Sequence, residues 1–157
     1  WTPAETSRRL YGDAPFVEIK DVAAFIEAHS GPDDTVANIG AEPELLFYAK
    51  RRSASGFLYC YPLVENQPYA GEMRRQWFAE MEHARPLFAV FTYSDAVWKD
   101  KPFREDVMRW WAEFRQGYDK VGVVNNVSAA TSAAYFGADP ELLRTTSGNF
   151  IEVYKRK

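Results

Sequence analysis

Residues 35–61 read Thr-Val-Ala-Asn-Ile-Gly, then Ala-Glu-Pro-Glu-Leu-Leu-Phe-Tyr-Ala-Lys-Arg-Arg, then Ser-Ala-Ser-Gly-Phe-Leu-Tyr-Cys-Tyr, and they decide the fold. The short apolar run 36–39 predicts a buried strand. Pro43 stands where a first helical residue needs no N–H, so residues 44–50 are expected to form a short helix. Residues 56–61 predict a second strand. The stretch is therefore interpreted as strand, helix, strand, the first parallel βαβ unit.

The same alternation continues on both sides of this stretch. Residues 1–12 are polar and are expected to be an irregular lead-in, while residues 94–101 and 128–138 are expected to be loops, the latter with a weakly determined helix as the alternative. Apolar residues at helical spacing predict helices over 16–29, 68–85 and 103–118. Strands are expected over 87–93, 121–124 and 150–154.

Strands that alternate with helices indicate parallel βαβ units. Residues 87–93 are apolar on both strand faces, which is typical of a sheet covered by helices on both sides. Residues 150–154 alternate and predict a last strand antiparallel to an earlier one. The predicted fold class is α/β: a three-layer, Rossmann-like sandwich with a mainly parallel sheet and an antiparallel C-terminal strand.

Composition sets bounds on the class of protein. The chain has 157 residues, 46% of them hydrophobic, which suits a single domain over residues 1–157 with its own core. The net charge of −3 with both signs interspersed argues against a nucleic-acid partner. No apolar run reaches the roughly 18 residues of a membrane span. Because the chain begins at Trp1 rather than Met, we expect a piece excised from a larger protein.

The turn after the first strand superficially resembles a dinucleotide-binding turn. It has one glycine, Gly40, and lacks the G-x-G-x-x-G pattern. Glu42 also places negative charge at a helix N-terminus, where a phosphate would need positive potential. Nucleotide binding is therefore disfavoured, and Glu42 is expected to cap its own helix or to pair with an arginine.

Other candidate binding residues have both a functional and a structural interpretation. Arg51 and Arg52 could clamp a phosphate or carboxylate, although favourable charge at a helix C-terminus explains them equally simply and is preferred. Tyr48 and Tyr61 could stack on a sugar, although tyrosines beside a core are more often packing residues.

The sequence shows no complete catalytic constellation. His29 and His83 lie on different predicted helices without a metal-binding spacing, so neither a metal nor another cofactor is expected. Cys60 is the only cysteine and is expected to be a buried small hydrophobe. A soluble enzyme that uses Cys60 as its nucleophile is retained as the least favoured hypothesis.

Several runs between residues 10 and 63 carry a family resemblance. These runs are Leu10-Tyr11-Gly12, Pro15-Phe16, residues 23–26, Asp33-Asp34-Thr35-Val36, Gly40-Ala41-Glu42-Pro43-Glu44-Leu45, Lys50-Arg51-Arg52 and Phe57-Leu58-Tyr59-Cys60-Tyr61-Pro62-Leu63. In this order they resemble the soluble C-terminal domain of bacterial multi-pass membrane glycosyltransferases. Relatives of that family include the dolichyl-phosphate-mannose protein mannosyltransferases and the lipid A aminoarabinose transferases. The resemblance covers about the first ninety residues.

The resemblance implies a periplasmic domain of a cell-membrane protein, lying on the extracytoplasmic side. Such enzymes transfer a sugar from a polyprenyl-phosphate donor, with the catalytic residues in loops between membrane helices. The chain itself is then expected not to be catalytic alone and to assist acceptor binding. Its expected partners are the membrane portion of the parent protein and a glycan, lipid or protein acceptor. The candidate ligand-binding residues are Glu42, Tyr48, Arg51, Arg52 and Tyr61.

A stand-alone α/β module that binds a ligand or another protein is the alternative hypothesis. It predicts ligand contacts at residues 40–42 and at Tyr61. These positions follow predicted strands, and ligands of open α/β sheets bind outside the carboxyl ends of the strands. Residues 93–95 follow the third predicted strand and are expected at the same edge of the sheet.

Overall fold

A computed structural model describes residues 1–12, 14–127 and 131–157 of the chain. It contains one six-stranded sheet in the order β2-β1-β3-β6-β4-β5. The strands are β1 (Thr35–Ile39), β2 (Arg52–Ser53), β3 (Phe88–Tyr93), β4 (Tyr118–Asn125), β5 (Ala133–Phe136) and β6 (Phe150–Arg156). The segment 128–138, predicted as a loop or helix, begins outside the described residues, and its described part holds strand β5.

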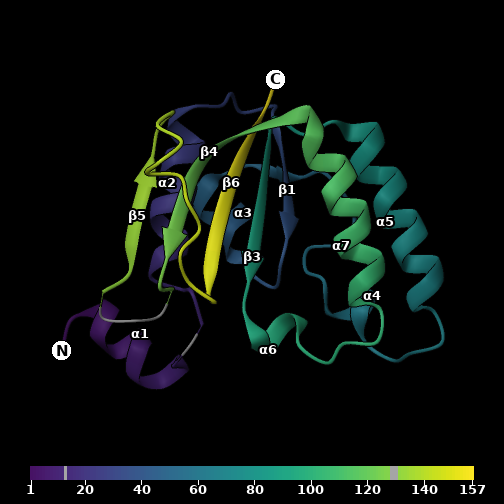
Figure 1. Ribbon diagram of the computed structural model, residues 1–157, viewed down its shortest axis with the longest axis horizontal. Coiled ribbons are helices and arrows are strands. Elements are labelled where there is room, and N and C mark those ends of the chain that lie inside the picture. The colour runs from purple at the N-terminus through teal and green to yellow at the C-terminus, as the bar shows by residue number, and fades with distance from the viewer. Residues whose placement is uncertain (13, 128–130) are drawn as a thin grey trace.

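The sheet is mixed, so the prediction of a mainly parallel, Rossmann-like sandwich is wrong. Only β2, β1 and β3 are parallel neighbours, whereas the pairs β3–β6, β6–β4 and β4–β5 are antiparallel. The physical reason lies in the C-terminal strand. β4 runs in the same direction as β3, but β6 is inserted between them in the opposite direction and converts one parallel crossover into two antiparallel pairs (Figure 1).

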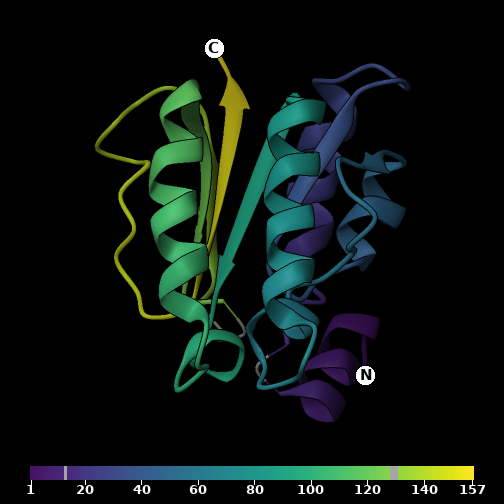
Figure 2. The same ribbon diagram turned by 90° about the vertical axis from the view of Figure 1, so that its right-hand side faces the viewer.

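Helices cover both faces of the sheet. One core cluster joins α2 and α3 to the sheet, and the other joins α4, α5, α6 and α7 to the opposite face. Figure 2 shows α5 and α7 running side by side. The helices are α1 (Pro3–Tyr11), α2 (Glu18–Ala28), α3 (Glu44–Ala49), α4 (Tyr61–Val64), α5 (Ala70–Ala84), α6 (Asp95–Trp98), α7 (Arg104–Phe114) and the short 3₁₀ helix η1 (Arg115–Gly117). Within the described residues, none of them is both long enough and apolar enough to cross a membrane.

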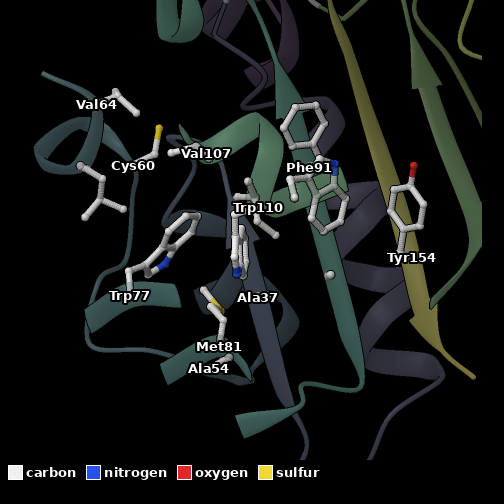
Figure 3. Packing of buried hydrophobic residues seen from close by; sticks show 14 of the residues in the cluster. Ala37, Ala54, Cys60, Val64, Trp77, Met81, Phe91, Val107, Trp110 and Tyr154 are labelled. Carbon is white, nitrogen blue, oxygen red and sulfur yellow. The ribbon is translucent and has the colours of Figure 1, made fainter. Parts of the chain in front are cut away.

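Aromatic side chains dominate the core between the sheet and the helices α5 and α7. The rings of Trp77 and Trp110 lie 5.0 Å apart between centroids, and Phe91 of β3 stacks on Trp111 at 5.5 Å. Figure 3 shows Trp77 and Trp110 side by side, with Cys60 near the edge of the same cluster. Burial of such large side chains supplies most of the hydrophobic free energy of this face.

The first helix, α1, replaces the irregular lead-in that the sequence predicts. A capping box begins it, because the Thr2 hydroxyl accepts the Glu5 N–H and the Glu5 carboxylate accepts the Thr2 N–H. No residue of α1 is buried. The helix is held to the body by Arg8, whose guanidinium donates to the Glu18 carboxylate at 2.8 Å. This ion pair places α1 near the carboxyl ends of β1 and β3 (Figure 1).

The predicted strand over 56–61 is also wrong. Residues 56–61 are all described and form no strand: the two-residue β2 lies before them, and Tyr61 begins helix α4. The segment is fixed instead by hydrogen bonds to the end of β1. The Cys60 N–H donates to the Gly40 carbonyl at 2.8 Å, and the Asn38 side chain donates to the Leu58 carbonyl at 2.9 Å. These two hydrogen bonds, one from the backbone and one from the buried Asn38 side chain, therefore hold the segment in place of the expected strand pairing.

Candidate functional site

A pocket lies at the carboxyl ends of β1 and β3, under the segment that joins α1 to α2. Its volume is about 340 Å³. Ligands of open α/β sheets bind at this edge, where successive loops converge. The lining residues are Tyr11, Ala14, Pro15, Phe16, Ala41, Glu42, Glu44, Tyr61, Ser94, Ala96 and Val97. The three segments expected at the strand ends, around Glu42, Tyr61 and Ser94, therefore meet in one place.

Glu42 is the most unusual group in this pocket. Its side chain folds back over the end of β1, and the residue is only 4% exposed. The Oε2 atom accepts the Ala41 N–H at 2.8 Å. A Cβ on Gly40 would lie 2.4 Å from this same oxygen and 3.0 Å from Thr92 Cβ, so a glycine is needed beneath the carboxyl group. The expected helix cap or arginine pair is not what holds Glu42.

Burial raises the pKa of Glu42 to about 7. The negative charge of Glu44 raises the pKa further, whereas the hydrogen bond from Ala41 and the nearby Thr92 hydroxyl lower it. The Thr92 hydroxyl itself is buried and makes no hydrogen bond of good geometry with any described residue. Near neutral pH the Glu42 carboxyl group can therefore both donate and accept hydrogen bonds.

Glu44 and Tyr61 add further polar groups to the lining. Burial raises the pKa of the Glu44 carboxyl group as well. The pKa of Tyr61 is raised first by burial and then by Cys60, Glu42 and Glu65. Above the Tyr61 ring lies the Lys101 ammonium group, 5.6 Å from the ring centroid, and it also pairs with Glu65 at 3.3 Å. The Lys101 charge is thus already balanced at the rim.

A second hollow adjoins the first and contains Tyr48. Its volume is about 590 Å³, and it shares Tyr11, Phe16 and Glu44 with the first pocket. Lys20 lies over the Tyr48 ring at 5.3 Å. Tyr48 therefore does not touch the Glu42 pocket but lines its extension beneath α1.

Arg51 and Arg52 lie at the other end of the strands, where β1 begins. Arg52 pairs with Thr35, the first residue of β1, whereas Glu42 follows the last residue of that strand. The Arg51 guanidinium donates to the Glu27 and Ser30 carbonyls at 3.1 and 2.7 Å, so it caps the C-terminal end of α2. This arrangement matches the structural interpretation of Arg51 and leaves both arginines outside the pocket.

Replacing Arg51 by alanine is expected to lower the free energy of unfolding by about 1–3 kcal/mol, because partly buried carbonyl groups lose a charged donor. Arg52→Ala is the matched control, since Arg52 is exposed, and its effect should stay within about 0.5 kcal/mol. Urea denaturation of both variants measures the difference. Equal stabilities of the two variants would show that the Arg51 contacts contribute nothing.

Cys60 has the properties of a packing residue. The residue is 1% exposed, and burial raises the pKa of its thiol, with the charge of Glu42 adding to the effect. The thiolate form that a nucleophile needs is therefore disfavoured. In the residues that the structure describes, no group of three or more His, Cys, Asp or Glu side chains could hold a metal ion.

Comparisons with protein-family models, with curated proteins and with solved structures find no match to this chain.

Proposed function

We propose that this chain is the extracytoplasmic domain of a membrane glycosyltransferase that uses a polyprenyl-phosphate sugar donor. In this proposal the membrane portion carries out the transfer, and the pocket around Glu42 binds part of the acceptor. The order of motifs from Leu10 to Leu63 supports the family assignment. The acceptor-binding role rests on the pocket.

One observation carries that role: motifs far apart in the sequence line a single pocket. Tyr11 and Phe16, the Glu42–Glu44 turn and Tyr61 belong to separate runs of the family pattern, and all of them line it. Carboxyl groups suit the hydroxyl groups of a sugar or of another polar acceptor, and aromatic faces suit its apolar ring surface. A pocket that combines the two fits a carbohydrate-sized polar ligand.

The position of the N-terminus is compatible with this arrangement. α1 lies at the end of the sheet that holds the pocket, and the C-terminus lies at the opposite end of the molecule (Figure 1). In the proposed parent protein, the membrane portion would join the domain through α1. The pocket would then face the membrane side, where a lipid-linked reaction takes place.

The alternative is a self-contained binding module. It is favoured by the fact that the described residues of this chain build the pocket without a second chain. The reading frame upstream of Trp1 separates the two hypotheses. We expect several apolar segments of about 20 residues each, and their absence would reject the glycosyltransferase assignment.

In the full-length protein, Tyr61→Ala is expected to raise the KM for the acceptor about tenfold while kcat changes little, because an aromatic binding face is lost. Tyr69→Ala is the control, since Tyr69 is exposed and does not line the pocket. Transfer assays on membranes with a polyprenyl-phosphate sugar donor measure both constants. An unchanged KM in Tyr61→Ala would show that the acceptor does not bind in this pocket.

A further inference from the structure

The Glu42 pocket contains two carboxyl groups without a basic partner. Neither Glu42 nor Glu44 forms an ion pair with any residue in the described ranges. The Lys101 ammonium group over the Tyr61 ring already pairs with Glu65, and Lys20 lies over the Tyr48 ring in the adjoining hollow. A carboxylate removed from water is unfavourable unless a cation or several hydrogen bonds compensate it. The pocket therefore has an unbalanced negative potential.

One carboxylate oxygen in the pocket has no hydrogen-bond partner among the described residues. Glu42 Oε2 accepts the Ala41 N–H, whereas the buried Oε1 atom of Glu44 forms no hydrogen bond of good geometry with any described residue. Both residues line the pocket, and Glu42 is only 4% exposed. A donor group inside the pocket could pair with the Glu44 oxygen.

Three aromatic rings also line the pocket. Tyr11 and Phe16 meet edge to face with centroids 5.1 Å apart, and both line the pocket together with Tyr61. The negative face of an aromatic ring attracts a cation, most strongly where water is excluded. Rings beside two carboxyl groups are the combination that recognises an ammonium group.

We propose that this pocket binds the protonated primary amine of a small ligand, with the ammonium group donating to Glu42 and Glu44 among the rings of Tyr11, Phe16 and Tyr61. The inference rests on the proposed function and refines it, because it gives the acceptor an amine. An amino sugar and an ethanolamine headgroup share this chemistry. Glucose differs from glucosamine at the amine position and is the matched neutral ligand.

Chemical-shift titrations of the backbone amides at pH 7 test the proposal with three probes: glucosamine, glucose and ethanolamine. We expect shifts centred on residues 40–44 and 94–97, with glucosamine binding at least about tenfold more tightly than glucose. An amino-sugar ligand predicts glucosamine as the tightest probe, and a headgroup ligand predicts ethanolamine. Either order supports an amine site.

Two variants then test whether the carboxyl groups of Glu42 and Glu44 bind the ammonium group. Glu42→Gln and Glu44→Gln should each weaken glucosamine binding about tenfold, whereas Glu141→Gln, on an exposed loop, should leave it unchanged. Glu44→Gln keeps the test valid should Glu42→Gln disturb the fold. Equal binding of glucose and glucosamine, insensitivity to both variants, or no shifts at these residues would overturn the proposal. The glycosyltransferase assignment would remain, since it fails only on the upstream reading frame and the transfer assay.

Discussion

Trp98→Ala is expected to lower the free energy of unfolding by about 3–5 kcal/mol, one of the largest single effects in this chain. Trp98 is completely buried and packs against the Phe91 ring at 5.8 Å. Its Nε1 atom donates to the Thr92 carbonyl at 2.7 Å. Alanine would leave a cavity and an unpaired carbonyl beside the pocket, because α6 carries the pocket residues Ala96 and Val97.

Two controls separate the causes of this effect. Trp98→Phe keeps most of the ring but loses the donor, so it should cost about 1–3 kcal/mol. Trp1→Ala removes the same side chain from a position that is 83% exposed, and its effect should stay within about 0.5 kcal/mol. Urea denaturation measures all three variants. Similar losses for Trp98→Ala and Trp1→Ala would contradict the burial of Trp98.

The second large effect is a pH-dependent stabilisation by Glu42→Gln. At pH 8 the variant should be more stable than the parent protein by about 3 kcal/mol, and at pH 4 the two should be equally stable. One pKa unit corresponds to about 1.4 kcal/mol, so raising the pKa of Glu42 from 4.5 to about 7 corresponds to about 3 kcal/mol.

The direction follows from proton binding. Between pH 4.5 and about 7 the folded protein keeps the Glu42 proton, whereas the unfolded chain has lost it. Stability conferred by this group therefore falls as the pH rises through that window. Glutamine remains neutral at every pH and avoids the loss. Denaturation curves at pH 4, 6 and 8 check this, with Glu141→Gln as the exposed control. A difference that does not change with pH would refute the explanation.

Much of the fold could be predicted from hydrophobic pattern alone. The helices α2, α3, α5 and α7 and the strands β1, β3, β4 and β6 overlap their predicted segments. Strand direction was harder, because the pairing of β6 between β3 and β4 depends on contacts distant in sequence. The antiparallel direction of the last strand is confirmed, and the mainly parallel sheet is not.

The errors in local structure have separate physical causes. Helix α1 has a readable signal, Thr2 with Glu5 three residues later and Pro3 between them, but its lack of buried residues hides it from an apolar pattern. β5 is a short edge strand that starts with two alanines and carries little β propensity. Helix α6, predicted as loop, has one turn anchored by Trp98.

The candidate site was partly predictable. Glu42 and Tyr61 could be placed at the carboxyl edge of the sheet because each was expected to follow a strand, although the segment before Tyr61 is not one. Arg51 and Arg52 were also candidate ligand-binding residues, but the preferred interpretation placed them at a helix C-terminus, where the Arg51 guanidinium lies. Tyr11 is the last residue of α1, which the sequence pattern missed, and Phe16 lies in the segment between α1 and α2.

Glu42 presents a buried carboxyl group, without an ion pair among the described residues, to the pocket that we propose binds an amine. The most direct measurement is the ¹³C shift of the Glu42 carboxyl carbon as a function of pH, with and without ethanolamine and with sodium chloride as the matched salt. We predict a midpoint of about 7 in the free protein, and a lower midpoint with ethanolamine, since a bound cation favours the carboxylate. A midpoint near the ordinary value of 4.5 without ligand, or one that ethanolamine leaves unchanged, would contradict the account.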